Sequence, residues 1–117
     1  MNSLVVFIGG GLGSLMRYGL SLAIGSRGFP LATLAANVAG CFLIGVFGAA
    51  GARFSWSETT RLLLTVGLCG GFTTFSTFSK ESLALLEGGS YGLFALYAAG
   101  SIAIGIAATA LGFWIVK

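Results

Sequence analysis

The sequence predicts an all-α integral membrane protein, and three observations support this fold class. Only 8% of the 117 residues are charged, whereas soluble domains carry roughly 25%. Hydrophobic residues make up 56% of the chain, and the mean hydropathy is +1.01. Because so few charges cannot cover a surface that faces water, we expect the chain to lie in a lipid bilayer.

The charged residues divide this single domain, residues 1–117, into four apolar stretches. A helix needs about 20 apolar residues to cross ~30 Å of hydrocarbon, so four crossings use most of the chain. Trp56, Tyr91 and Trp114 lie near the ends of these stretches, where aromatic side chains favour the membrane interface. We therefore expect four transmembrane helices, near residues 3–25, 31–52, 60–86 and 91–116.

The first helix begins with an apolar, glycine-rich run that imitates a strand entering a dinucleotide-binding loop. That motif needs an acid about 20 residues further on, but the first acid in the chain is Glu58. We instead expect Gly9 and Gly13 to let another helix approach closely. Arg17 either snorkels to the interface or pairs with carbonyls of a broken helix. No basic residue precedes this apolar run, so we do not expect a cleaved signal peptide.

The second helix contains Asn37 in an otherwise apolar run. A primary amide at membrane depth is costly unless it is hydrogen-bonded, so Asn37 should face the protein interior or a wet cavity. A functional role and a role as a hydrogen bond between helices remain equally open. We interpret Cys41 and Cys69 as small packing residues and do not expect a disulfide.

The third helix should be broken, because Gly70-Gly71 is followed by Phe72-Thr73-Thr74, and glycine and β-branched residues are poor helix formers. Non-helical backbone at this depth is tolerated only where it is buried or lines a cavity. Beyond the break, Phe75 and Phe78 share one face with Ser79. The positive edges of two such rings could meet an anion.

The fourth helix carries a stripe of hydroxyls at Tyr97, Ser101 and Thr109, with Gly105 at the remaining place of the series. The stripe is either a set of hydrogen bonds between helices or the wall of a narrow polar path.

Basic residues are divided evenly between the two sides of the four predicted helices. An even division gives no positive-inside bias, so the chain could insert in both orientations. Dual insertion would permit an antiparallel homodimer with a two-fold axis in the membrane plane. The side with both termini holds Arg53, Arg61 and Lys117, and the other holds Arg17, Arg27 and Lys80.

The chain lacks the residues of most catalytic and metal chemistry. It has no His and no Asp, and its three acids are Glu58, Glu81 and Glu87. This composition argues against histidine acid–base catalysis, Ser-His-Asp triads and most zinc sites. We therefore expect no enzyme, and we expect membrane lipid and no nucleic acid among the partners.

Three segments resemble the CrcB/Fluc family of small fluoride channels, and the resemblance covers essentially the whole chain. They are the run from Gly70 to Ser79, the Gly-x-x-Gly-Ser-x-x-Arg-Tyr pattern at 10–18, and Thr-Leu-Ala-Ala-Asn-Val-Ala-Gly at 33–40. The resemblance implies an antiparallel, dual-topology dimer of four-helix subunits. It also implies two narrow fluoride pores and a structural sodium ion at the two-fold axis.

The resemblance also implies roles for individual residues. Backbone carbonyls of Gly70 and Thr73 would hold the sodium, and Arg17 and Glu81 would lie near the pore ends. At Gly105 the polar track has no side-chain donor. The residues expected to line the pore or bind fluoride are Asn37, Phe75, Phe78, Ser79, Tyr97, Ser101 and Thr109.

The expected function is passive, electrodiffusive export of fluoride across a bacterial inner membrane, which protects the cell from fluoride toxicity. One alternative is a small multidrug-type exporter that exchanges organic cations for protons. That mechanism needs an acid at membrane depth, for which Glu81 is the only candidate. A non-transporting membrane anchor is a third class, although it would not need a broken helix.

Overall fold

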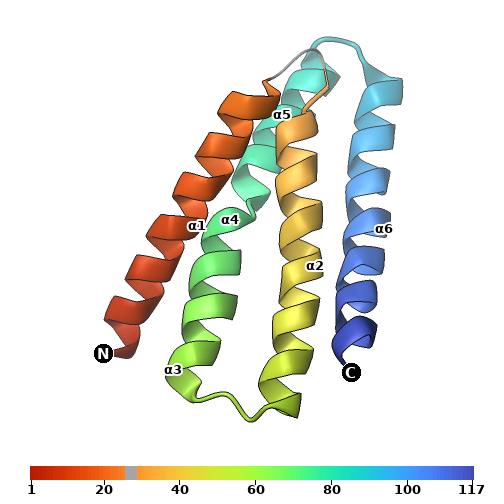
Figure 1. The fold of residues 1–117 in the computed structure, drawn as a ribbon. Coiled ribbons are helices and arrows are strands. Elements are labelled where there is room, and N and C mark those ends of the chain that lie inside the picture. The colour runs from red at the N-terminus through yellow and green to blue at the C-terminus, as the bar shows by residue number, and fades with distance from the viewer. Residues whose placement is uncertain (26–28) are drawn as a thin grey trace.

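The computed structural model describes residues 1–25 and 29–117, and its long elements are all helices. They are α1 (Asn2–Ile24), α2 (Leu31–Arg53), α3 (Glu58–Arg61), the π-helix η1 (Leu62–Cys69), α4 (Gly70–Phe72), α5 (Phe75–Glu87) and α6 (Tyr91–Val116). Elements α3 to α5 form one bent third span (Figure 1).

The prediction of four long, apolar helices is confirmed. Within the described residues, four helical spans are long and apolar enough to cross a membrane: Asn2–Ile24, Leu31–Arg53, Glu58–Glu87 and Tyr91–Val116. Both termini and the connection between α2 and α3 lie at the same end of the bundle (Figure 1). Part of the predicted loop 26–30, including Arg27 and its charge, lies outside the described residues.

Glycine allows the helices to pack at backbone contact distance. A Cβ atom on Gly13 would collide with the backbone of Leu68 and Phe72, so α1 can lie against the third span only because this side chain is absent. A Cβ on Gly45 would collide in the same way with the Thr109 carbonyl on α6. Such close approach maximises van der Waals contact, which drives helix association where lipid removes the hydrophobic effect.

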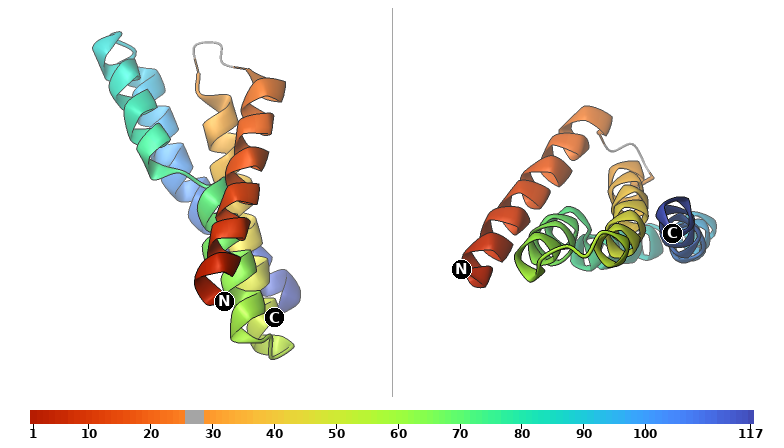
Figure 2. Two further views of the ribbon diagram at one scale, coloured as in Figure 1. Left: turned by 90° about the vertical axis from the view of Figure 1, so that its left-hand side faces the viewer. Right: turned by 60° about the horizontal axis from the view of Figure 1, so that its bottom comes forward.

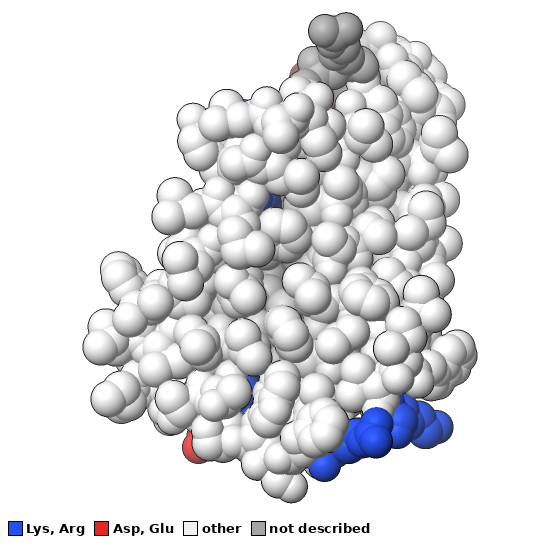
Figure 3. Space-filling model, viewed as in Figure 1, with Lys and Arg blue, Asp and Glu red and all other residues white. Residues whose placement is uncertain are grey.

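The exterior of the bundle is apolar, as a bilayer requires. Large apolar side chains such as Phe7 and Trp114 are exposed, whereas Tyr97 is the largest fully buried side chain among the described residues. Figure 3 shows a face that is almost free of charge, with basic side chains gathered at the end that holds the termini. Lipid tails would cover such a surface without leaving polar groups unpaired.

The third span departs from regular α-helix at two places. Residues 62–69 are wound as a π-helix, a feature that sequence periodicity did not indicate. Thr73 (φ −88°, ψ 156°) and Thr74 (φ −151°, ψ 124°) are extended, and α5 begins directly after them. Beyond this point α5 and α6 run together, away from α1 (Figure 2).

Candidate functional site

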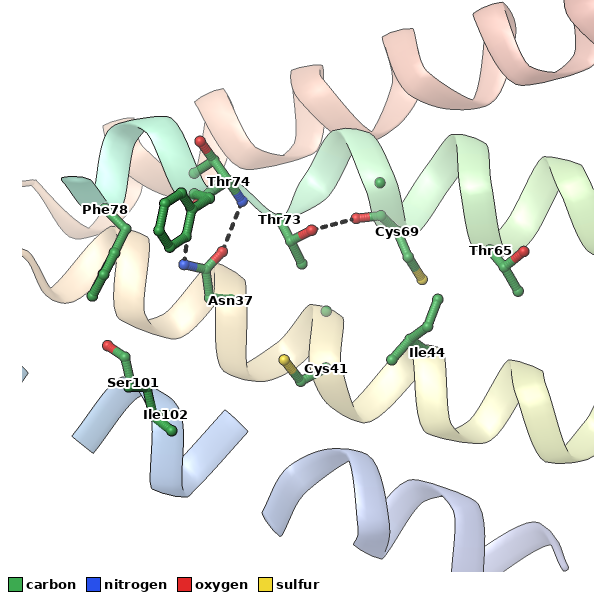
Figure 4. A pocket seen from close by; sticks show the side chains of 13 residues that line it. Asn37, Cys41, Ile44, Thr65, Cys69, Thr73, Thr74, Phe78, Ser101 and Ile102 are labelled. Carbon is green, nitrogen blue, oxygen red and sulfur yellow. Dashed lines mark hydrogen bonds between the residues drawn. The ribbon is translucent and has the colours of Figure 1, made fainter. Parts of the chain in front are cut away.

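Asn37 pairs with the extended backbone of the third span. Its Oδ1 accepts a hydrogen bond from the Thr74 amide at 2.9 Å, and its Nδ2 donates to the Thr74 carbonyl at 3.2 Å (Figure 4). The side chain thus replaces the helical partners that Thr74 has lost. The expectation that Asn37 is hydrogen-bonded in the interior is confirmed, and one Nδ2–H remains for another acceptor.

The two extended residues, Thr73 and Thr74, interrupt the third span, and this interruption changes the hydrogen-bond partners of neighbouring backbone groups. Because the Thr74 amide turns to Asn37, the Gly70 carbonyl loses the donor that a continuous helix would supply. The Gly71 carbonyl accepts a hydrogen bond from Arg17 Nε at 3.3 Å. This hydrogen bond agrees with the second of the two interpretations of Arg17, in which the side chain pairs with backbone carbonyls of the third span. The Thr74 hydroxyl caps α5 by accepting from the Thr77 amide at 3.2 Å.

Replacing Asn37 with leucine should destabilise the protein strongly. Each buried polar group left without a partner costs about 1–3 kcal/mol, and this substitution strands both the amide and the carbonyl of Thr74. Thermal unfolding in detergent measures the loss. Asn2→Leu is the matched control, since Asn2 makes one exposed hydrogen bond, with Thr59. Equal melting temperatures for the two variants would contradict the argument.

A cavity of about 400 Å³ opens beside the Asn37–Thr74 pair, between α2, the third span and α6. None of the residues that line it is charged, so the groups it offers are an amide, hydroxyls, thiols, backbone and aromatic rings (Figure 4). The lining residues are Asn37, Gly40, Cys41, Ile44, Thr65, Cys69, Gly70, Thr73, Thr74, Phe75, Phe78, Ser101 and Ile102.

A second cavity, of about 900 Å³, continues along α2 and α6 toward the end that holds the termini. It shares Cys41, Ile44, Ser101 and Ile102 with the first cavity and is also lined by Gly105 and Thr109. The shared walls place the two cavities next to each other along one face of α6.

Aromatic rings border the first cavity. The Phe75 and Phe78 ring centroids are 5.7 Å apart, and those of Phe78 and Tyr97 are 4.9 Å apart. Phe75 is 78% exposed in the single chain, so packing within one subunit does not explain its position. Tyr97 is fully buried and donates its hydroxyl hydrogen to Glu81 Oε1 at 3.2 Å.

A third, polar cavity of about 100 Å³ lies on the other side of the interruption. Arg17 and Glu81 both line it, together with Thr33 and Thr77. Both charged side chains are half-buried. Opposite charges therefore face a space of the size that one or a few water molecules occupy.

The predicted site residues fall into separate groups. Asn37, Phe75, Phe78, Ser101, Gly70 and Thr73 line the first cavity, and Thr109 lines only the second. Tyr97 lines none of these three cavities, and Ser79 is exposed on α5 away from them.

Sequence reasoning missed Thr74 and Cys41 as site residues. Thr74 pairs with Asn37, and Cys41 lines both large cavities. A signal was available for Cys41, because it lies one helical turn beyond Asn37 and shares its face. None was available for Thr74, whose role depends on contact with a distant helix.

Comparison with known proteins gives a consistent result along nearly the whole chain. The family model described as "CrcB-like protein, Camphor Resistance (CrcB)" matches residues 4–113. The fluoride-specific ion channel FluC of Phocaeicola vulgatus is 51% identical over 114 residues, covering 95% of this chain and 94% of that protein. Channels of the same name from Bacteroides fragilis (48% identity; 92% and 89% covered) and Thermus thermophilus (50%; 94% and 90%) are also similar.

Proposed function

Because the chain belongs to the CrcB family, we infer that it is a fluoride-specific ion channel, and that fluoride passes the cavity beside Asn37. The observation that carries this path is the pairing of Asn37 with Thr74, which opens the third span onto a cavity with no charged lining residue. An ion channel requires no covalent step, so the protein is not an enzyme.

Neutral donors suit conduction of a small, strongly hydrated anion. A selective path must replace the water around fluoride, yet bind it weakly enough for it to leave. A fixed cation at low dielectric would hold the anion too strongly. Asn37, Phe75 and Phe78 line the first cavity, and they would offer an anion the remaining Nδ2–H and two positive ring edges. Ser101 Oγ is buried there and has no hydrogen-bond partner among the described residues.

The polar cavity between Arg17 and Glu81 would serve as the entrance on one side. Its hydroxyls and the guanidinium group of Arg17 can hold water around an arriving anion. Arg17 would also attract fluoride without lining the cavity beside Asn37. Glu81 is held by the Tyr97 hydroxyl, which keeps its carboxylate near the edge of the aromatic group.

A sodium ion would fit the carbonyl groups at the interruption. Sodium is a hard cation and prefers oxygen ligands. The Gly70 carbonyl lacks the donor that a continuous helix would supply, and Thr73 is extended. Gly70 is exposed on the single chain, as a site shared with a second subunit requires. When bound, the ion would supply positive potential without lining the path. A melting temperature that is equal in sodium and N-methylglucamine salts would contradict this assignment.

The functional unit would be an antiparallel homodimer in the bacterial inner membrane. The even division of basic residues and the open cavity beside exposed Phe75 support this arrangement. The relatives named above come from bacteria and cover nearly the same length. Single-cysteine reporters in each loop, labelled in a cysteine-free background, should react from both sides of the membrane. Labelling from one side alone would exclude dual topology.

Fluoride flux from liposomes tests the function directly. Purified protein reconstituted with internal potassium fluoride should release fluoride to an ion-selective electrode once a potassium ionophore balances the charge. Chloride loaded in the same way should remain inside. Absence of fluoride release would exclude the channel function, and comparable chloride release would exclude selectivity.

The alternative of a proton-coupled cation exporter is not supported. The family match and the similar proteins all indicate a fluoride channel. In addition, the carboxylate of Glu81, the acid that such an exporter would need, is hydrogen-bonded to Tyr97.

A further inference from the structure

The hydroxyl stripe on α6 has a gap at Gly105, between Ser101 and Thr109. The two flanking hydroxyls differ in what they can donate. Ser101 Oγ is buried and has no hydrogen-bond partner within residues 1–25 and 29–117. Thr109 Oγ1 donates its hydrogen to the Gly105 carbonyl at 3.1 Å, so that hydrogen is used within its own helix. The stripe therefore lacks a side-chain donor of its own just beyond Ser101.

The thiol of Cys41 fills this gap from the neighbouring helix. A Cβ atom on Gly105 would lie 3.4 Å from Cys41 Sγ, which is ordinary contact distance, so the sulfur covers the place where a side chain at 105 would begin. Figure 4 shows Cys41 on the side of α2 that faces α6. Cys41 and Ser101 both line the first and the second cavity, so the sulfur lies where the two cavities adjoin.

We propose that the Cys41 thiol lines the fluoride path at the level of Gly105 and supplies the donor that α6 lacks there. This proposal rests on the proposed channel function and concerns the passage from the first cavity to the second. A protonated thiol is a weak donor, and it is neutral, so it would contact fluoride without holding it. Cys69 also carries a free thiol, but it lines the first cavity alone.

Thiol modification tests whether the path passes Cys41. Methyl methanethiosulfonate is small and neutral. The Cys41 thiolate would attack its sulfenyl sulfur, forming a Cys–S–S–CH₃ disulfide. The S–S bond of the reagent breaks, methanesulfinate leaves with the bonding pair, and the thiol proton goes to solvent. The added group would occupy the junction of the two cavities.

The flux of each variant is compared before and after the reagent. In Cys69→Ser, which keeps Cys41, the reagent should reduce the fluoride flux by about tenfold or more, because the passage is narrow. Dithiothreitol should restore the flux. Cys41→Ser should keep its flux under the reagent. Inhibition that persists in Cys41→Ser would overturn the proposal. So would normal flux in Cys69→Ser after mass spectrometry has shown that its Cys41 is modified.

Moving the donor between helices tests the role of the thiol itself. Cys41→Ala should lower fluoride flux several-fold below that of Cys41→Ser, because serine keeps a hydrogen-bond donor at this position and alanine does not. Adding Gly105→Ser to Cys41→Ala places a hydroxyl in the same gap and should restore flux, whereas a merely structural cysteine predicts no such rescue. Melting temperatures and elution volumes of the four proteins identify folding defects.

The outcomes separate this inference from the proposed function. No fluoride flux in the unmodified protein would mean that the channel function itself is wrong. Normal flux in that protein, together with unchanged flux in Cys41→Ala, would refute the role of Cys41 alone.

Discussion

Replacement of Gly13 by valine should abolish the folded protein, whereas the same replacement at Gly11 should be tolerated. A Cβ on Gly13 would meet the Phe72 amide at 2.7 Å and would also collide with the Leu68 carbonyl, and neither is a flexible side chain that could move aside. At Gly11 a Cβ would meet nothing within 4 Å. Both variants put a β-branched residue into α1, so their helix propensities match.

The expected cost at Gly13 is about 3 kcal/mol or more, because the overpacking is against backbone. Size-exclusion chromatography and thermal unfolding in detergent measure it. We expect Gly13→Val to aggregate or to melt far below the parent, and Gly11→Val to elute and melt like the parent. If both variants fold equally well, α1 does not pack against η1 and α4 as described.

Gly13 also shows how far the sequence could predict the fold. Its spacing from Gly9 predicted a close helix contact, because small residues one turn apart form a flat face. The spacing did not reveal the partner, which is the backbone of the third span near Leu68. Local composition is sufficient to place four apolar helices, whereas the choice of neighbour depends on tertiary packing.

In the candidate site, too, local composition predicts which residues matter, whereas their partners depend on tertiary packing. The sequence predicts a role for Asn37 because a primary amide at membrane depth needs partners, but those partners are backbone groups of Thr74, an extended residue 37 positions further along the chain. The π-helix at 62–69 likewise has no periodic signal in an almost uniformly apolar run. The hydrogen bond from Thr109 to the Gly105 carbonyl could have been foreseen, since threonine often bonds to the carbonyl four residues back.

The expected role of Tyr97, lining the pore or binding fluoride, stays a prediction. The hydroxyl stripe suggested that it faces a polar path, but in the single chain it is fully buried and donates to Glu81. Its ring lies against Phe78, which does line the first cavity. If fluoride passes the first cavity as proposed, Tyr97 would act on its path through Phe78, by fixing the orientation of that ring.

Replacing Phe75 and Phe78 together with isoleucine should remove most fluoride flux while the protein still folds. Isoleucine keeps the apolar bulk but has no positive ring edge. If each ring edge contributes as much to holding the anion as an edge contact between two aromatic rings does, about 0.5–1.5 kcal/mol, losing both reduces flux by roughly 5- to 140-fold, since about 1.4 kcal/mol corresponds to a factor of ten. The packing cost within the subunit should be small at Phe75, which is 78% exposed, and larger at Phe78, whose ring centroid lies 4.9 Å from that of Tyr97.

Phe7→Ile is the matched control for this experiment. Phe7 is also 78% exposed, but it lies on α1 and lines none of the three cavities. Liposome flux and the yield of the proposed dimer are measured for both variants. We expect normal flux and yield for Phe7→Ile, and a large loss of flux with nearly normal dimer yield for the double variant. If the dimer yield falls as much as the flux, the two rings serve packing. A ring that only fills space should not lower the flux through protein that remains assembled.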